Sequence, residues 1–530
     1  MSLRSHRPVL VIGAGLAGCT TALCLAEKGV PVTLLAASDS SQNANSWLAQ
    51  GGIIYRAPEQ DDASRLEKDI VTAGHGLNLP DAVSFLAEDG PQTVEELLIT
   101  HLAVPFDRSE QTPGPSPAWD LTREGGHSTS RIVHCADHTG RTIMEHVQRA
   151  VLRHPAITYL QGYTAIDLLT SHHHCQGLVY RYQLENECCG AYVLNETAKT
   201  VETMLADVTV LATGGAGQVY LHSSNVSTAT GAGLAMASRA FVRLMNMEFM
   251  QFHPTTLFHM EPRRFLITEA LRGEGAHLIN AAGARFMEKR DPRGELAPRD
   301  VVSRAIVDEL LTTGEPCVFL DVRPVKHDLE ARFPTVLQSC LERGIDIRTQ
   351  PIPVVPAAHY FCGGILVDRT GRTSLSRLYA VGECACTGLH GANRLASTSL
   401  LEALLWGKAA GEDIAKRVLD GLGPFTTLHE DINDWRALGH EHNDDPALIA
   451  QDWAAIRHTM WNYVGITRTT ARLVRAFEDL RDLSRHLHDF YKSTPLSRPI
   501  IELFHGCQTA YLITQAALRN KDDIGCHHRI

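Results

Sequence analysis

The sequence predicts an α/β fold, in which a Rossmann-like nucleotide-binding domain is interrupted by an inserted α+β capping domain and followed by a C-terminal helical bundle domain. Three observations support this prediction. The chain opens with a strand, a glycine turn and a helix; two more strands ending in glycine occur much later; and the end of the chain has only helical periodicity. With 530 residues the chain is also too long for one core. The predicted boundaries are 1–246 and 361–420 for the nucleotide-binding domain, 247–360 for the capping domain and 424–530 for the bundle.

The N-terminal unit has the pattern strand, glycine turn, helix, strand. Val9–Ile12 is apolar throughout, residues 17–27 have helical periodicity, and residues 32–35 form the second strand. The turn lets backbone approach a pyrophosphate at the helix N-terminus, and it consists of Gly13, Ala14, Gly15, Leu16, Ala17 and Gly18. The acid usually found at the end of the second strand is absent, since Ala36 and Ala37 lie there and Asp39 comes slightly later. Ribose recognition must therefore differ, and this unit alone leaves FAD and NAD open.

Two later strands favour FAD. One runs through residues 208–212 and breaks at Thr213, Gly214 and Gly215; the other, 378–381, ends at Gly382 and Glu383. Nucleotide contacts spread over three distant strands suit a large flavin nucleotide that lies lengthwise, because a nicotinamide domain is complete within a much shorter segment.

The segments that follow differ in character. Residues 247–360 contain polar motifs and prolines, which predicts loops and short helices, while 453–463, 468–485 and 501–518 are predicted bundle helices.

Arg394, between the capping segment and the bundle helices, lies in a glycine-containing loop just before a helix start. An Arg there can donate two N–H bonds to a carboxylate beside free helix N–H groups. The alternative is a structural Arg that holds a loop.

Composition excludes several classes of function. The net charge of −11 argues against nucleic acid or an anionic membrane as partner, and no apolar run is long enough to span a bilayer. Met1 to Arg7 lead into the first strand without a signal-like apolar stretch, so we expect a cytoplasmic protein. The 13 cysteines include no Cys-x-x-Cys, which predicts reduced core thiols and no iron–sulfur cluster. We interpret His172-His173-His174 as a solvated hairpin loop and expect no metal site.

Taken together, these motifs resemble the flavoprotein family of fumarate reductase and succinate dehydrogenase over nearly the whole chain. The resemblance rests on Gly13–Gly18, the Ala49-Gln50-Gly51-Gly52 run, residues 121–127, 251–255, 268–275, 294–300 and 359–364, and His390 to Glu402. Within the family the chain resembles the L-aspartate oxidase branch. Asn45 stands where the dehydrogenases carry the flavin-linking His, Glu124 follows Thr122-Arg123, and Ala396-Ser397 replace two glycines. Ala232 and the alanines after the second strand depart from the family's usual Asp and Lys.

The resemblance implies a set of cofactor contacts and substrate contacts. FAD, bound noncovalently, would contact the glycine turn, the Thr213–Gly215 turn, and Asn45, Ser46, Ala49, Gln50, Gly51, Gly52, Glu383, Ser399 and Leu400. Arg394, His253 and His359 would hold carboxylates, with Thr268 adding a hydroxyl. Arg299 would be the acid–base residue with Glu269 as its proton relay, and Glu124 would accept from the substrate amine. The alternatives are a core His253 beside Pro254, an Arg299–Asp300 pair, a Glu124 that caps backbone N–H groups, and a structural Arg272–Glu274 pair.

The implied reaction is oxidation of L-aspartate to iminoaspartate, the first step of NAD biosynthesis. Reduced FAD would be reoxidised by O₂, giving H₂O₂, or by fumarate, giving succinate. Iminoaspartate hydrolyses easily, so delivery to quinolinate synthase is an expected partnership, with the protein a monomer or homodimer. The runner-up is a soluble fumarate reductase or a succinate dehydrogenase flavoprotein subunit. A non-catalytic nucleotide-binding protein is the third reading, but it would not need Arg299, Arg394, His253 and His359 together.

Overall fold

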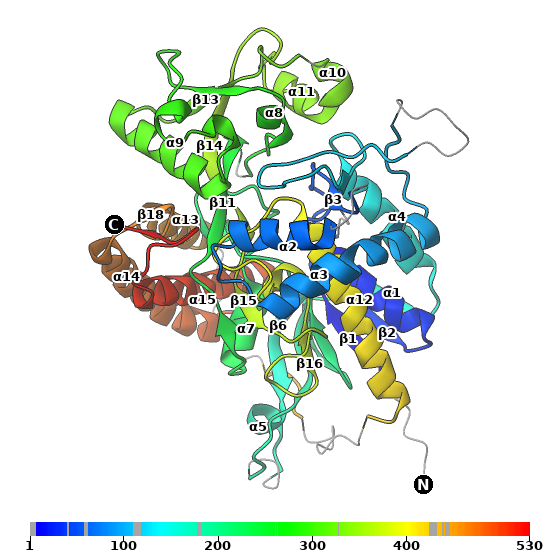
Figure 1. Cartoon of the computed structure of the whole chain (residues 1–530). Coiled ribbons are helices and arrows are strands. Elements are labelled where there is room, and N and C mark those ends of the chain that lie inside the picture. Colours follow the sequence, from blue (N-terminus) through cyan, green and yellow to red (C-terminus); the bar gives the residue numbers. More distant parts are fainter. Residues whose placement is uncertain are drawn as a thin grey trace.

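The computed structural model describes most of the chain: residues 7–39, 42–57, 62–109, 118–177, 182–259, 261, 263–326, 328–422, 432–436, 439 and 446–530. Figure 1 shows a central body built on a parallel sheet, a lobe above it, and a group of helices from the C-terminal part of the chain beside it.

A five-stranded parallel sheet forms the centre of the body. Its order is β16-β9-β1-β2-β5, so strands from the beginning, middle and late part of the chain lie side by side. The strands are β1 (Val9–Ile12), β2 (Val32–Ala36), β5 (Ile157–Gln161), β9 (Thr209–Leu211) and β16 (Leu378–Ala380). The predicted first, second and two later strands are confirmed, although both later strands are shorter than expected.

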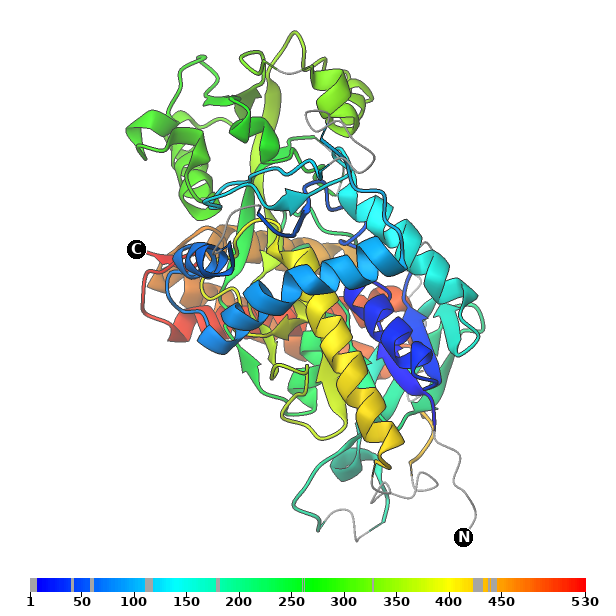
Figure 2. The ribbon, with the colours of Figure 1, turned by 45° about the vertical axis from the view of Figure 1, so that its right-hand side comes forward.

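The sheet is covered on both faces, which explains why β1 is apolar at every position. Val9 and Val11 face one core, and Leu10 and Ile12 face the other. The first core is formed with helices that pack around α1, and Figure 2 shows α12 lying beside α1. The elements on this side are α1 (Leu16–Glu27), α2 (Asp62–Ala73), α3 (Pro80–Thr93), the π-helical η1 (Val94–His101), α4 (Thr139–Arg153), α12 (Thr398–Leu419), and the strand pair β3 (Ile53–Ile54) and β4 (Ile132–Val133).

The second core is shared by two small sheets and several helices. The three-stranded antiparallel sheet consists of β6 (Tyr163–Thr170), β7 (Cys188–Asn195) and β8 (Thr200–Leu205). The other sheet consists of β10 (Leu244–Met245), β15 (Gly364–Leu366) and β17 (Ala385–Cys386). The neighbouring helical elements are α5 (Ser171–His174), α7 (Ala232–Arg239), η2 (Gly217–Val219) and η5 (Gly382–Cys384).

The three consecutive histidines lie in α5, a single helical turn after β6, so the predicted loop is wrong in its local structure. His173 is exposed, and its Nδ1 lies 2.9 Å from the Thr170 hydroxyl. No group of His, Cys, Asp and Glu suited to a metal occurs among the described residues.

The lobe at the top of Figure 1 has a sheet and a core of its own. Its antiparallel sheet has the order β11-β14-β13-β12. The long strands β11 and β14 also reach the second core of the body, to which Phe252 and Phe361 belong. The elements are β11 (Met250–Leu257), β12 (His277–Ile279), β13 (Val318–Asp321), β14 (Ile352–Phe361), α8 (Ala270–Gly273), η3 (Met287–Lys289), η4 (Gly294–Leu296), α9 (Arg299–Thr313), α10 (Leu329–Arg332) and α11 (Pro334–Leu341).

Three helices near the C-terminus pack on one another and on the second core. They are α13 (Pro446–Tyr463), α14 (Thr470–Ser493) and α15 (Arg498–Arg519). The predicted helices are confirmed, but α13 begins earlier than expected, and α14 begins at Thr470 because the Thr469 hydroxyl accepts the Arg472 N–H. The expectation of a purely helical segment is wrong, since β18 (Thr467–Arg468) pairs with β19 (His528–Arg529). The predicted start at residue 424 lies outside the described residues.

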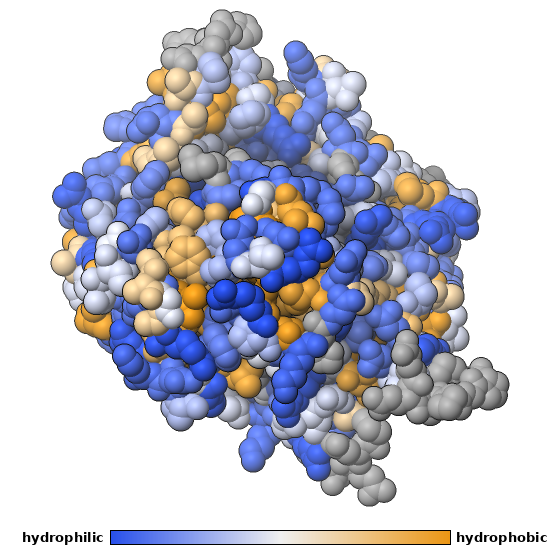
Figure 3. Space-filling view, turned by 90° about the horizontal axis from the view of Figure 1, so that it is seen from above, coloured by the Kyte–Doolittle hydropathy of each residue, from blue (hydrophilic) through white to orange (hydrophobic). Residues whose placement is uncertain are grey.

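The cysteines and the surface agree with an ordinary globular chain. All thirteen cysteines lie in the described part of the chain; they are buried and none forms a disulfide, as predicted. On the face shown in Figure 3, hydrophobic residues occur in small groups among hydrophilic ones. Within the described part of the chain, no helix has the length and apolar character needed to cross a membrane.

Candidate active site

One cavity is lined by residues that lie far apart in the chain. All the residues predicted to act on substrate line it, namely Glu124, His253, Thr268, Glu269, Arg299, His359 and Arg394. Of the predicted cofactor contacts, Gly18 and Gly215 do not line it, and the others do. Gly18 lies under the turn, where an added Cβ would be 1.9 Å from Gly13 O. At Gly215 an added Cβ would lie 2.1 Å from Glu383 Oε1, so this glycine leaves space for the Glu383 side chain.

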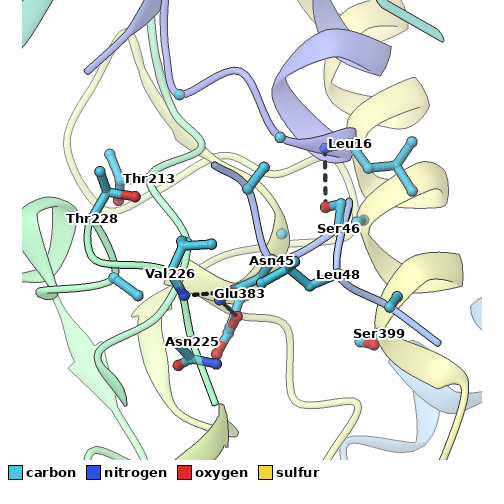
Figure 4. A pocket seen from close by; sticks show the side chains of 18 of the residues that line it. Leu16, Asn45, Ser46, Leu48, Thr213, Asn225, Val226, Thr228, Glu383 and Ser399 are labelled. Carbon is cyan, nitrogen blue, oxygen red and sulfur yellow. Dashed lines mark hydrogen bonds between the residues drawn. The ribbon is translucent and has the colours of Figure 1, made fainter. Parts of the chain in front are cut away.

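The glycine turn places the N-terminus of α1 at the cavity. Gly13 has a φ of +116°, and an added Cβ would lie 2.1 Å from Ala212 O, so only glycine fits there. Gly15, the N-cap residue of α1, has no side chain to bond the first N–H groups of the helix. The Leu16 N–H donates to Ser46 Oγ at 3.2 Å, which ties the turn to the loop after β2 (Figure 4). Free N–H groups at a helix start suit a phosphate.

Asn45 and Glu383 both line the cavity and join three segments of the chain (Figure 4). Asn45 accepts the Val226 N–H at 3.0 Å and donates to Glu383 Oε2 at 3.5 Å. Glu383 Oε1 accepts the Phe361 N–H at 2.9 Å. Burial raises the pKa of Glu383 to about 7, against the lowering effect of that hydrogen bond.

Arg299 and Arg394 converge on one atom. Arg299 donates to Gln251 Oε1 at 3.0 Å, and Arg394 donates to the same oxygen at 3.1 Å. Gln251 is fully buried, and its Nε2 donates to Asn393 Oδ1 at 2.7 Å and to Arg394 O at 2.8 Å. Two guanidinium groups from different lobes are thus held side by side, with charges that suit a dicarboxylate.

Two histidines lie close to these arginines. The rings of His253 and His359 have centroids 5.1 Å apart. Burial first, and then the positive charge of Arg299, lowers the pKa of His253 well below its ordinary value; for His359, the neighbouring His253 adds to these effects. Both are therefore neutral imidazoles at ordinary pH. Ser224 Oγ lies 2.9 Å from His359 Nδ1 and orients that ring.

Glu269 is the ionic partner of Arg299. Its Oε2 accepts from Arg299 Nε at 2.7 Å, and its Oε1 lies 3.4 Å from Arg272. Burial opposes ionisation, but the two arginine charges outweigh it and lower the pKa of Glu269 to about 2. The two structural pairings left open by the sequence do not form: Asp300 pairs with Arg304, and Glu274 pairs with Arg332.

Glu124 faces the cavity from the loop before β4. Its Oε2 accepts the Ser397 hydroxyl at 2.6 Å, and an added Cβ at Gly51 would lie 2.3 Å from its Oε1. Burial raises the pKa of Glu124, against the Ser397 hydrogen bond. Ser397 itself has a φ of +57°, which is uncommon for a residue with a Cβ.

Several site residues were missed from the sequence, although some carried a signal. Gln251 is a polar residue in a buried strand, and the family resemblance places Ser397 where the dehydrogenases carry a glycine. Tyr360 lies in the 359–364 motif, but its contact with Arg394 was not predicted: the Arg394 guanidinium lies 4.4 Å from its ring centre. The Tyr360 hydroxyl donates to Glu402 at 2.7 Å, and His390 lies 2.9 Å from the same carboxylate.

Comparison with known proteins identifies the family. The FAD binding domain family matches residues 8–400. A curated L-aspartate oxidase from Pseudomonas aeruginosa is 43% identical and aligns over 100% of this chain and 96% of that protein. Another, from Vibrio cholerae, is 41% identical over 99% of this chain and 96% of that protein. The chain belongs to the L-aspartate oxidase family.

Among solved structures, FrdA of the E. coli quinol fumarate reductase matches this member of the L-aspartate oxidase family with a TM-score of 0.86. The two are 27% identical, and the match covers 99% of this chain and 91% of that chain. The fold is therefore the FAD-binding fold of the fumarate reductase and succinate dehydrogenase flavoproteins, and FAD is the cofactor.

The residues that line the cavity fit FAD. Among the described residues, Gln50 Oε1, Thr213 Oγ1, Asn225 Oδ1 and Thr230 Oγ1 are buried, lack a hydrogen-bond partner and belong to residues of the cavity wall. Buried polar atoms are rarely left unpaired, so these atoms suit the polar groups of a bound nucleotide. Arg394 Nε is also buried and has no hydrogen-bond partner among the described residues, so this N–H can donate to a substrate anion.

Proposed function

We propose that this enzyme oxidises L-aspartate to iminoaspartate at the site where Arg299 and Arg394 share Gln251 Oε1. This shared oxygen is the observation that carries the proposal. It sets two cations beside each other in the same cavity as the α1 glycine turn. When bound, FAD supplies a two-electron acceptor beside this site.

The two carboxylates of the substrate have matched anchors. Arg394 and Arg299 offer N–H groups that a carboxylate accepts in pairs, and the neutral His253 and His359 add uncharged polar contacts. Thr268, 5% exposed, adds a hydroxyl at the same wall. Burial removes competing water, so each charge-assisted hydrogen bond contributes more than it would at the surface.

Glu124 would receive the substrate amine. Its carboxylate accepts from the ammonium, and its raised pKa makes it a better base than an exposed carboxylate. Once the ammonium has lost a proton to Glu124, the nitrogen lone pair can form the C=N bond as the hydrogen leaves Cα with its electron pair. Loss of the second nitrogen proton gives iminoaspartate.

Arg299 and Glu269 would supply the proton for the reduction of fumarate, the reaction in which the flavin gives up its electrons. A guanidinium is a poor base but can donate a proton to a carbanion-like carbon. Glu269, bonded to Arg299 Nε at 2.7 Å and close to Arg272, would return that proton from solvent. Either O₂, which becomes H₂O₂, or fumarate, which becomes succinate, takes the electrons in the second half-reaction.

We propose three further features. FAD is held noncovalently, because Asn45 has no nucleophilic ring nitrogen and its amide already bonds Val226 and Glu383. The segment 247–360 caps the substrate, since it supplies His253, Glu269 and Arg299 to the cavity. Iminoaspartate passes to quinolinate synthase in NAD biosynthesis.

The decisive experiment is anaerobic titration of the yellow protein with L-aspartate, D-aspartate and succinate, followed by flavin absorbance. Bleaching by L-aspartate and not by D-aspartate or succinate supports the proposal. Bleaching by succinate alone favours the runner-up, a fumarate reductase or succinate dehydrogenase flavoprotein. Acid precipitation that leaves the yellow colour in the supernatant supports noncovalent FAD.

A further inference from the structure

One end of the cavity lies where β2 ends, and the expected acid is missing there. The wall at this end includes Leu35, Ala36, Ala37 and Ser38, together with Tyr159. In dinucleotide-binding folds a carboxylate at this position accepts hydrogen bonds from the ribose hydroxyls. Without one, Ala36 and Ala37 at the end of β2 offer those hydroxyls no acceptor side chain.

Two nearby acids do not fill the gap. Neither Asp39 nor Glu196 lines the cavity. The Asp39 carboxylate is directed toward Gly162, where an added Cβ would lie 3.0 Å from Oδ1. Glu196 accepts the Thr164 hydroxyl at 2.8 Å.

The first turns of α15 bring another acid to this place. Arg498 donates to Ala37 O at 2.6 Å, which fixes the helix against the residue that follows β2. Arg498 Nε also donates to Glu502 Oε1 at 2.7 Å. Glu502 lines the cavity, and its side chain is 22% exposed. Within the described residues the other carboxylates of the wall are Glu124, Glu269 and Glu383, which the contacts above place away from β2.

We propose that Glu502 accepts hydrogen bonds from the adenosine ribose hydroxyls of FAD, in place of the acid missing after β2. Arg498 holds one carboxylate oxygen and leaves the other for the ligand. A partly desolvated carboxylate gains from hydroxyl donors, because burial has removed part of its water. Burial raises the pKa of Glu502 despite the charge of Arg498, which fits a group that lacks part of its solvation. The C-terminal helix α15 therefore takes part in cofactor binding.

The test measures FAD affinity of the full-length protein after its flavin has been removed, by fluorescence titration. FAD is compared with an analogue whose adenosine ribose lacks the 2′ and 3′ hydroxyls. We expect the analogue to bind wild-type protein about tenfold more weakly or worse. Glu502→Gln should weaken FAD binding similarly, and should bind FAD and the analogue nearly equally, because the two changes remove the same interaction.

Glu478→Gln is the matched control, since Glu478 is exposed on α14 and does not line the cavity. It should keep the preference of wild-type protein for FAD. Equal binding of FAD and the analogue by wild-type protein would overturn the proposal without the need for any variant. The proposal would also be overturned if the loss of affinity caused by Glu502→Gln and the loss caused by removing the ribose hydroxyls simply added when the variant is measured with the analogue. The readout is cofactor affinity, so the proposal can stand or fall independently of the substrate proposed above.

Discussion

Glu124 separates the two reactions of the proposed site, because L-aspartate brings an amine to it and fumarate does not. Glu124→Gln keeps the shape of the side chain but removes its charge and its ability to take a proton. We expect kcat/KM for L-aspartate to fall by about 10- to 100-fold, the size of a lost charge-assisted hydrogen bond. Fumarate reduction should change much less. Both rates are measured by flavin absorbance in rapid mixing, and equal losses would contradict the role.

Ser397 acts on the same carboxylate at a cost in backbone energy. Its φ of +57° and ψ of 9° place it in the left-handed region, which costs an ordinary residue about 1 kcal/mol. Its hydroxyl donates to Glu124 Oε2 at 2.6 Å and lowers the pKa of that carboxyl. A strained serine where glycine would fit better points to a functional use of the hydroxyl.

Two substitutions separate strain from function at Ser397. Ser397→Gly should melt at the same temperature as the parent or higher, whereas Ser397→Ala should not gain this stability. Both should lose activity toward L-aspartate by about tenfold. Both should also move the acidic limb of the kcat/KM profile to higher pH, because Glu124 loses a bond that favours its charged form. If Ser397→Gly keeps full activity and an unmoved profile, the hydroxyl has no such role.

At the scale of elements, the C-terminal strand β19 and the turn before it support the loop that carries Arg394. The Cys526 N–H donates to Ala392 O at 3.0 Å, and its thiol donates to Asn393 Oδ1 at 3.3 Å. Arg468 on β18 bonds His527 Nδ1 at 2.6 Å. The end of the chain therefore packs directly behind the two residues that precede Arg394.

Removing residues 524–530 should loosen this loop. We expect a lower melting temperature and a KM for L-aspartate raised by about tenfold, with a smaller change in kcat, because binding geometry suffers more than chemistry. The control is Ile530→Ala, whose side chain is 70% exposed and should be neutral. An unchanged KM in the shortened protein would show that Arg394 is positioned without the tail.

Elements specified by local sequence were predictable, and those specified by distant contacts were not. Residues 9–36 contain their own apolar strands, glycine turn and helix, so the N-terminal unit followed from pattern alone. The two-residue strands β18 and β19 pair across a long stretch of chain, and neither segment has a strand-like run of its own. The start of α14 depended on a single cap at Thr469, which periodicity does not register.

At the scale of the whole molecule, the same distinction applies to the site. Motif spacing and family resemblance identified residues that do line one cavity, including Arg299, Arg394 and Glu124. The bonds that hold the site together were not predictable, because they join segments far apart in the chain: Gln251 accepts from Arg394, Glu124 accepts from Ser397, and Arg498, the partner of Glu502, donates to Ala37 O. Their residue types alone give no sign of such pairing until the fold brings the partners together.

Buried histidines give the whole molecule a defined pH dependence. Burial, with nearby arginine charges, lowers the pKa to about 4 at His127 and His222 and to about 3 at His505 and His527. An unfolded histidine titrates near 6.5, so between about pH 6.5 and pH 4 the unfolded chain binds more protons and the free energy of unfolding falls as pH falls. Each such histidine lowers the free energy of unfolding by up to about 1.4 kcal/mol for each pH unit in this range.

Glu383, whose pKa is raised to about 7, acts in the opposite direction, as do Glu124 and Glu502, whose pKa burial also raises. The buried histidines outnumber these carboxyls, because the pKa of His253 and of His359 is lowered as well. We therefore expect a lower melting temperature at pH 5 than at pH 7, measured by calorimetry on the FAD-loaded protein. His527→Gln should make the free energy of unfolding depend less steeply on pH, by the contribution of one titrating group. Glutamine can accept the hydrogen bond from Arg468 but does not titrate. A melting temperature that stays level between pH 7 and pH 5 would mean that these histidines are protonated in the folded protein.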